Sequence, residues 1–484
     1  MFESTPMILS HRLMPEGYRT VLGYPGFRRL STAALISFLG DGLAVVALAW
    51  VALTLSPPGR EGLVIGAAVA AYTLPAAAGA VLLAPWLSRV DARRLVSLNA
   101  TLRAVALGAV TALHLAGKLD VAGYVTLLAI SSVLAAWGNA GIYTLVSRMF
   151  TVERRLPANS LLSTAQQVSV IIGPALAGIL VANVHAAVVL GVDALTFAFL
   201  GFQVLRVRTP PAEAAPRRPQ LSAGFRLLAR RPHLAGLLGV TAAFFFLYGP
   251  VEVALPIYIT GELRGSAGLL GTFWTVFGVG AVLGGLLGGA LRVTRQWPFV
   301  VAVVAGWGAV LVPFGFLDAA APALLLFAFG GFVYGPFVAF SLALFQNATD
   351  PDDLPAVLAA RGAITTGVAP IGAAVGGPLV EMVGAGGALL ASGAATVALA
   401  GITALVLLAV RRARHRPLLR PQPGEADSRR IRDSAHPAMN TGGGIAAADQ
   451  APRLASRPKS PGKGLCSRQH HRTAELRHNE NRIS

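Results

Sequence analysis

Twelve blocks of about 20 mostly apolar residues occupy almost the whole chain up to residue 410 and constrain its fold more than any other feature. A helix of that length rises 1.5 Å per residue, so it crosses the roughly 30 Å hydrocarbon core of a bilayer. The blocks are 30–55, 62–87, 95–116, 121–146, 160–181, 186–207, 234–259, 269–291, 299–317, 321–345, 356–382 and 386–410. We therefore predict an all-α polytopic membrane protein with about twelve transmembrane helices.

The composition supports a membrane protein. Of the 484 residues, 54% are hydrophobic and only 13% are charged, whereas soluble domains are roughly one quarter charged. The frequent glycines and prolines are compatible with membrane helices, where neighbouring helices satisfy the freed backbone groups. Cys466 is the only cysteine, which excludes a disulfide within the chain and a thiolate metal cluster. We expect no metal site and no cofactor.

The blocks fall into two sets of six, and the halves resemble each other. Leu156-Pro157 precedes a span that contains Gly173, and Leu354-Pro355 precedes a span that contains Gly372, an offset of about 199 residues. Two repeated six-helix bundles with a site between them are typical of secondary transporters. We therefore predict an N-terminal segment, a first bundle, a linker, a second bundle and a tail, over residues 1–29, 30–207, 208–233, 234–410 and 411–484.

Basic residues of the short loops alternate between the two sides of the predicted bundles, and such bias sets membrane orientation. The rich side carries Arg12, Arg19, Arg28, Arg29, Arg89, Arg93, Arg94, Arg148, Arg154, Arg155, Arg292, Arg295 and the linker arginines from Arg206 to Arg231, and the poor side carries Arg60, Lys118 and Arg264. One loop on the rich side instead carries Asp350, Asp352 and Asp353. Residues 1–20 lack the apolar region of a signal peptide. We predict a multi-pass plasma-membrane protein with both termini in the cytoplasm.

The tail from residue 411 to 484 is strongly basic. It holds 16 Lys and Arg against 6 Asp and Glu, so its net charge of +10 is more than half of the chain's +18. It contains no Phe, Trp or Tyr, and therefore offers no stacking platform for single-stranded nucleic acid. We predict a disordered cytoplasmic tail near anionic membrane lipid, and no nucleic-acid partner.

Four motifs follow one another in an order that resembles the major facilitator superfamily over residues 30–410, and in particular its actinobacterial drug and metabolite exporters. They are the loop Ala84-Pro85-Trp86-Leu87-Ser88-Arg89-Val90-Asp91-Ala92-Arg93-Arg94, the element Gly173-Pro174-Ala175-Leu176-Ala177-Gly178, the segment Asp193-Ala194-Leu195-Thr196-Phe197, and the stretch from Tyr248 to Pro256. The resemblance implies alternating access of two bundles, with the loop and the Gly-Pro element acting in the conformational change. In the loop, Ser88 replaces an aspartate of the family pattern, so it can cap a helix but cannot supply a charge.

The candidates for ion coupling are carboxylates deep within the predicted spans, where an ionised group is energetically costly. No phosphate-binding Gly-x-x-x-x-Gly-Lys-Ser/Thr loop is present, so we expect a transporter driven by an ion gradient and not an enzyme. Asp41, Glu252 and Asp193 lie within spans, where an ionised group must face water or find a partner. Arg103 is the basic partner predicted for Asp41 or a conformational switch. The prolines around Glu252 predict a broken helix there, which would border a substrate site.

The family resemblance implies a cavity lined by the first, fourth, seventh and tenth spans. Those spans carry Trp50, Trp137, Asn139, Tyr143, Phe245, Tyr248, Tyr334 and Phe337. Aromatic rings with few fixed charges suit an amphipathic organic molecule, although aromatic residues in membrane helices also pack or mark interfaces.

We expect a monomer that exports a small organic compound, such as a drug or a secondary metabolite, in exchange for protons. Uptake of a nutrient or siderophore-like ligand is the alternative within transport, and a membrane sensor or assembly protein is the alternative of another class. The sequence leaves proton and sodium coupling both open.

Overall fold

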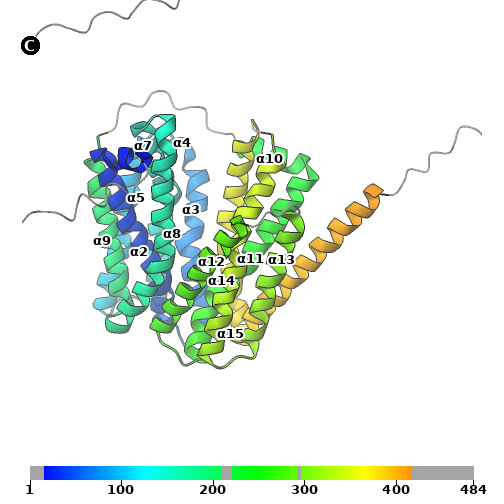
Figure 1. The fold of residues 1–484 in the computed structure, drawn as a ribbon. Coiled ribbons are helices and arrows are strands. Elements are labelled where there is room, and N and C mark those ends of the chain that lie inside the picture. Colours follow the sequence, from blue (N-terminus) through cyan, green and yellow to red (C-terminus); the bar gives the residue numbers. More distant parts are fainter. Residues whose placement is uncertain (1–15, 209–220, 291–295, 351, 416–484) are drawn as a thin grey trace, which may run out of the picture. The chain divides into compact units, whose positions relative to one another are not determined.

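The computed structural model describes residues 16–208, 221–290, 296–350 and 352–415, and the regular elements in these ranges are all helices (Figure 1). This confirms the predicted all-α class. The first 15 residues, most of the linker, Arg292, Arg295 and the basic tail lie outside the described residues, so the predictions made for them stay untested.

Ten helices belong to the first bundle and the linker. Their bounds are α1 Glu16–Leu22, α2 Pro25–Leu55, α3 Glu61–Leu82, α4 Ala84–Leu87, α5 Ala92–Leu115, α6 Val121–Ser132, α7 Ala135–Met149, α8 Val152–Asn183, α9 Ala186–Leu205 and α10 Leu221–Arg230. The second bundle comprises α11 Pro232–Gly261, α12 Ala267–Ala290, α13 Gln296–Leu311, the short 3-10 helix η1 Val312–Gly315, α14 Ala320–Asn347 and α15 Leu354–His415.

Eleven helical runs in the described residues are long and apolar enough to cross a membrane. The last run is 55 residues long, more than twice the roughly 20 residues that one crossing requires. Gly384, with φ 77° and ψ 169°, breaks α15 into two spans there. A residue with a side chain adopts such a φ only with strain, which explains the glycine. The described chain therefore contains twelve spans.

Helix α11 corrects one sequence-based prediction. It runs without interruption from Pro232 to Gly261, so Pro250 and Pro256 do not break it. Each proline removes one backbone hydrogen bond, but its fixed φ is compatible with a helix. Both prolines are buried, and neighbouring helices support a span that has lost such bonds.

The helices form two groups (Figure 1). In the first, α2 packs against α8 and α9, and α5 packs against α9; in the second, α11 packs against α15, and α12 against α14. Between the groups, α3 packs against α15 and α8 packs against α12.

Glycines form the contact between the two bundles. A Cβ atom on Gly377 of α15 would lie 2.7 Å from the carbonyl oxygen of Gly62 of α3, and one on Gly178 of α8 would lie 3.2 Å from the α-carbon of Gly271 of α12. We call these two lines of contact the glycine seam. Gly62 and Gly178 lie near the ends of their helices that adjoin the loops with few basic residues.

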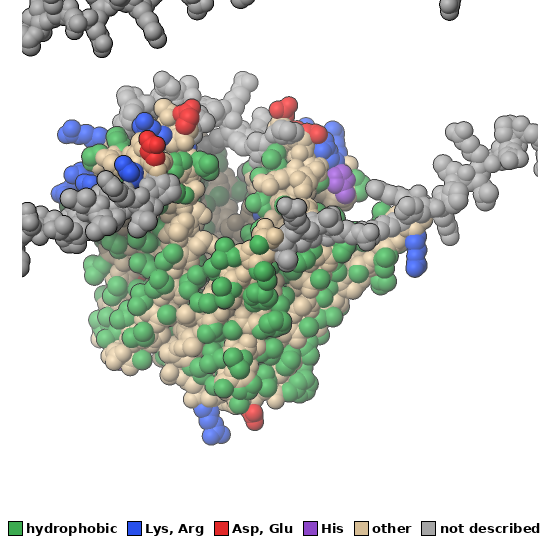
Figure 2. Space-filling view, in the orientation of Figure 1, with side chains coloured by type: hydrophobic (Ala, Val, Ile, Leu, Met, Phe, Trp, Pro, Cys, Tyr) green, Lys and Arg blue, Asp and Glu red, His purple; other side chains and the backbone are tan. Residues whose placement is uncertain are grey.

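Charged residues mark the other end of the bundles. Lys and Arg gather there, and the surface between the two groups is hollowed (Figure 2). We call it the arginine-rich end. Among the described residues, the ion pairs at this end stay within one bundle: Arg148 pairs with Asp91, and Arg231 pairs with Asp350 and Asp353. The two bundles therefore meet at the seam and are separate at the arginine-rich end.

Candidate functional site

A charged cluster lies inside the first bundle, around Asp41 of α2. Its Oδ1 accepts a hydrogen bond from Nη1 of Arg103 at 2.7 Å and another from the Tyr72 hydroxyl at 3.1 Å. The Arg103 side chain is 8% exposed and that of Asp41 is 38% exposed. The pair therefore has one buried member and one that is partly accessible.

Asp193 of α9 is the second carboxylate of this cluster. It is fully buried, and its Oδ1 accepts a hydrogen bond from the Thr196 hydroxyl at 3.2 Å. Its Oδ2 has no hydrogen-bond partner among the described residues. Gly40 lets α9 approach this closely, because a Cβ atom there would collide with the Asp193 carboxylate. Asp193 and Asp41 both act electrostatically on Arg103, so two carboxylates share one guanidinium.

The guanidinium of Arg103 also contacts two aromatic rings. The guanidinium carbon of Arg103 lies 4.9 Å from the centroid of Tyr72 and 4.5 Å from that of Phe197. Cation–π contacts strengthen when the cation is removed from water. The sequence predicted Arg103 and both carboxylates as candidates and included Thr196 in the Asp193–Phe197 segment, but it did not single out Tyr72. A lone tyrosine on an apolar helix gives no signal that would distinguish it from its neighbours.

A second group, in the other bundle, consists of Glu252 and a set of aromatic rings. Tyr248 and Tyr334 lie 5.7 Å apart between centroids, and Phe245 and Phe337 lie 6.0 Å apart. Glu252 is half-buried, one helical turn from Tyr248. The structure therefore brings together four of the predicted cavity aromatics with the predicted carboxylate.

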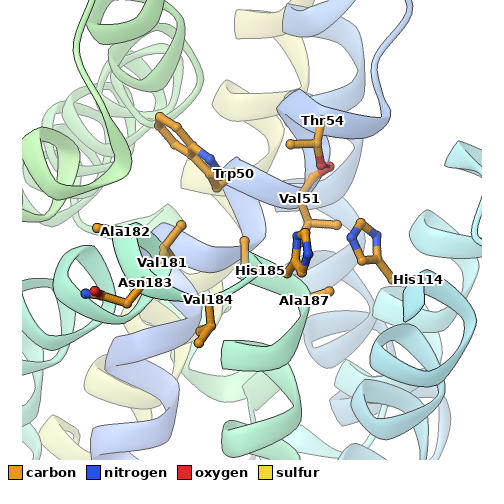
Figure 3. Close-up of a pocket in the computed structure, with 11 residues that line it drawn as sticks. Trp50, Val51, Thr54, His114, Val181, Ala182, Asn183, Val184, His185 and Ala187 are labelled. Atoms are coloured by element: carbon orange, nitrogen blue, oxygen red, sulfur yellow. Dashed lines mark hydrogen bonds between the residues drawn. The ribbon is translucent and has the colours of Figure 1, made fainter. Parts of the chain in front are cut away.

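The aromatics predicted from the first bundle do not join that group. Trp137 is buried, and its Nε1 donates a hydrogen bond to the Gly79 carbonyl oxygen at 2.9 Å, which ties α7 to α3. Asn139 and Tyr143 are exposed. Trp50 lines a cavity of about 430 Å³ at the end opposite the arginines, together with His114 and His185 (Figure 3). The role of these four residues in substrate binding stays a prediction.

In the loop between α3 and α5, Asp91 is the carboxylate that makes hydrogen bonds and an ion pair. Asp91 is the N-cap of α5 and accepts a hydrogen bond from the Arg93 backbone N–H at 2.9 Å. It also pairs with Arg148 of α7. Ser88 is the C-cap residue of the short helix α4. The side chain that caps the start of α5 is that of Asp91 and not that of Ser88. Arg89 and Arg94 are exposed, and Arg93 is half-buried.

The surroundings of Asp91 favour its ionised form. Partial burial raises the pKa of the carboxyl, but the hydrogen bonds from Arg148 and from the Arg93 N–H outweigh that effect and lower the pKa below its ordinary value. Because the folded-state pKa is the lower one, the interaction stabilises the fold above the unfolded pKa of about 4. This contribution is lost as the pH falls through the folded-state value.

Replacing Asp91 by alanine should lower stability by about 1–2 kcal/mol at neutral pH, because both the cap and the ion pair are lost. Asp91→Asn should cost less, since an asparagine still caps the helix. Thermal unfolding of the purified variants at pH 7 and at pH 3.5 checks this. The difference between wild type and Asp91→Asn should shrink at the lower pH; an equal difference at both values would contradict the role of the charge.

The Gly-Pro element of α8 contacts a different helix at each end. Gly173 lies against the backbone of Gly42 in α2, inside the first bundle. Gly178 lies in the glycine seam against α12, and Gly271 of α12 packs against the Pro174 carbonyl. The element therefore links the bundle interior to the surface that meets the other bundle.

Comparisons with known proteins agree with this architecture. The family model described as Major Facilitator Superfamily matches residues 30–260. An uncharacterized MFS-type transporter, y4rN, of Sinorhizobium fredii is 27% identical over 378 residues, which cover 75% of this chain and 90% of that protein. The multidrug efflux pump Tap of Mycolicibacterium fortuitum is 25% identical over 372 residues, covering 73% and 88%. The crystal structure of the nucleoside transporter NupG has the same fold, with a TM-score of 0.63, 15% identity and coverage of 79% and 99%.

The fold, the charged pair inside the membrane spans and these relatives define a polytopic membrane transporter and not an enzyme. Over residues 30–260 the chain is similar to the major facilitator superfamily, and its relatives include a drug exporter of an actinobacterium.

Proposed function

We propose that the protein is a proton-driven exporter of small amphipathic organic compounds in the bacterial plasma membrane, working by alternating access. Relatives named multidrug efflux pumps support export. We assign the arginine-rich end to the cytoplasm, because basic residues are retained on that side. The bundles are then closed at the glycine seam outside and separate at the cytoplasmic side, so this conformation receives substrate from the cell.

The cluster of Asp41, Arg103 and Asp193 is the observation that carries proton coupling. One guanidinium cannot neutralise two carboxylates, so the cluster favours binding one proton as well. A proton on Asp41 would weaken its bond to Arg103. Arg103 could then donate to Asp193, whose Oδ2 has no hydrogen-bond donor among the described residues. Loss of the proton would restore the pair seen here. The exchange changes which of α2 and α9 is tied to α5, and so couples protonation to helix arrangement.

Asp41→Asn should abolish gradient-driven export while the protein still inserts and folds. Asparagine keeps the shape of the side chain and an oxygen that accepts from Arg103, but it cannot release a proton at neutral pH. The measurement is accumulation of a fluorescent lipophilic dye in cells that express the full chain, with and without a protonophore. We expect low accumulation in the wild type, and high accumulation in the variant or after the proton gradient is collapsed.

Asp318→Asn is the matched control, since it removes an exposed carboxylate from a loop and should leave export unchanged. Replacing sodium by choline should also change nothing; a loss of export there would indicate sodium coupling. Higher accumulation in wild-type cells than in cells without the protein would instead indicate uptake, and equal accumulation in all strains would contradict export of this class of compound.

A further inference from the structure

We propose that His114 and His185 form a binding site for an exchangeable divalent transition-metal ion, such as zinc, at the end of the first bundle opposite the arginines. The site, called here the histidine pair, lies in the cavity of about 430 Å³ shown in Figure 3. The sequence predicted no metal site, because the two histidines are far apart in the chain and only the fold brings them together. Binding of the ion is a property of the pair, whereas its effect on transport rests on the proposed function.

The two imidazole rings lie side by side. His114 is in the last turn of α5, and His185 is the residue that precedes α9. Their ring centroids are 6.0 Å apart, and the ring planes are inclined by 59°. An imidazole nitrogen binds zinc at about 2.0–2.1 Å, so two imidazoles that share one ion lie roughly 5–6 Å apart between centroids. The observed separation is at the upper end of that range, so a small rotation of either side chain allows both rings to bind one ion.

Contacts between α5 and α9 fix the spacing of the helix ends that carry the pair. The Thr111 hydroxyl, one helical turn before His114, donates a hydrogen bond to the Ala187 carbonyl oxygen at 2.6 Å. Gly191 lets α9 come this close, because a Cβ atom there would lie 3.0 Å from the Thr111 hydroxyl oxygen. The two histidines therefore stand on elements that are already tied together, which favours a defined ligand geometry.

Neither imidazole is engaged elsewhere. His185 is the N-cap residue of α9, but its side chain makes no capping hydrogen bond. Within the described residues, neither histidine makes a hydrogen bond or an ion pair through its ring, and each ring contacts the other. A neutral imidazole has one nitrogen with a free lone pair, and such nitrogens bind zinc, copper and nickel. The pair therefore offers two free ligands.

The lining of the cavity decides which ion fits. The described residues that line it include no Asp, Glu, Lys or Arg, and no group of three or more metal-binding side chains is found among the described residues. Calcium and magnesium require several oxygen ligands, carboxylates in particular, so the pair disfavours them. Water completes the coordination of a zinc ion here. An ion held by two protein ligands, where a structural zinc site has four, is exchangeable.

Charged groups on the surrounding elements are engaged or distant. Lys118 lies in the exposed loop after α5, and Asp120 caps the start of α6. On α2, α5 and α9, Asp41 and Asp193 share Arg103. The remaining charged side chains of these helices and of α7 and α8 lie at the arginine-rich end. A metal ion needs neutral imidazoles, so protons should displace it from the pair as the pH falls.

A bound ion joins the ends of α5 and α9. The same two helices carry Arg103 and Asp193, which the proposed function places in a proton-dependent exchange of partners. An ion held by both helices opposes their relative movement, and therefore slows transport. The orientation proposed above places the histidine pair outside the cell, so the ion arrives from the medium.

The test measures zinc bound by the purified full-length protein in detergent, without a polyhistidine tag. At pH 7.5 we expect the wild type to bind one zinc ion more than His114→Ala, His185→Ala or the double variant, and at pH 5.5 the difference should vanish. The other histidines and Cys466 are present in each of these proteins, so any ions that they bind cancel in the difference. His233→Ala is the matched control, since it removes an exposed histidine from α11, and it should bind zinc like the wild type.

Thermal unfolding gives a second readout and shows whether the variants are folded. Without zinc, the variants should unfold at the same temperature as the wild type, because neither imidazole makes a hydrogen bond within the described residues. Zinc should raise the unfolding temperature of the wild type more than that of His114→Ala or His185→Ala, since a ligand that binds the folded state stabilises it.

Equal zinc binding by the wild type and a folded His114→Ala variant would overturn the proposal. Loss of one ion in each single variant and of two in the double variant would also overturn it, because the histidines would then belong to separate sites.

The effect on transport is measured in intact cells. Zinc added to the medium should slow dye export by the wild type and not by His114→Ala; equal slowing of both would contradict the link between the pair and transport. Zinc binding that depends on both histidines, without any gradient-driven export, would support the site and contradict the proposed function.

Discussion

Arg103→Met should destabilise the folded protein by about 3 kcal/mol, because removing one partner of a buried ion pair leaves an uncompensated charge. The methionine preserves much of the side-chain volume but removes the guanidinium that Asp41 and Asp193 share. Asp193 is fully buried and Asp41 is 38% exposed. Because Asp41 is only partly buried, we place the cost at the lower end of the usual range for buried pairs.

The matched control for this prediction is Arg361→Met. Arg361 also lies within a span, but in the described residues it contacts the Ser341 hydroxyl and the ring of Phe345 and has no carboxylate partner. Its loss should cost about 1 kcal/mol, the value of an ordinary hydrogen bond. Thermal unfolding in one detergent should therefore give a clearly lower apparent midpoint for Arg103→Met than for Arg361→Met.

A second substitution distinguishes charge from packing. Arg103→Met leaves the carboxylates of Asp41 and Asp193 without a cationic partner. Adding Asp41→Asn removes one of these two charges, so the double variant should recover most of the lost stability. If the double variant is as unstable as the sum of the two single variants, then Arg103 stabilises the bundle through packing alone. In that case the shared guanidinium does not explain the cluster.

The sequence predicted the fold well because membrane spans leave a strong signal. The length of each apolar block and the alternation of basic loops are set by the bilayer, not by tertiary contacts. The gap predicted between the last two blocks, residues 383–385, contains the break that the structure places at Gly384. The helix α10 was not predicted, because ten residues between proline-rich and charged segments give only a short periodic pattern.

The candidate sites were predictable in part only. Carboxylates at membrane depth are rare, so Asp41, Asp193 and Glu252 could be found from the sequence, and Arg103 followed as a partner for Asp41. The grouping of these residues could not be found, since it depends on how helices rotate about their axes. The predicted break in α11 was wrong because a proline's local effect was weighed without the neighbouring helices that support the span.

Gly377→Ala should abolish most transport by preventing the bundles from meeting at the glycine seam. A Cβ atom at Gly377 would lie 2.7 Å from the Gly62 carbonyl oxygen, closer than such contacts occur, and backbone atoms cannot rotate away. Overpacking of this kind costs about 1–3 kcal/mol. The cost falls only on the conformation in which the seam is closed, so the equilibrium should shift roughly 5–150-fold towards the conformation that is open there.

Gly367→Ala on the same helix separates this effect from the loss of a glycine. No atom lies within 4 Å of a Cβ added at Gly367, so it should transport like the wild type. The shift between the two conformations can be measured with the substitution Val380→Cys in a protein that also carries Cys466→Ser. Val380 lies beside Gly62 in the glycine seam. A membrane-impermeant maleimide added to intact cells should label the introduced cysteine slowly in the wild type and in Gly367→Ala, and quickly in Gly377→Ala. Equal labelling in all three, with transport lost only in Gly377→Ala, would show that the glycine acts inside a bundle, and the seam would then not be the gate that closes the outer side.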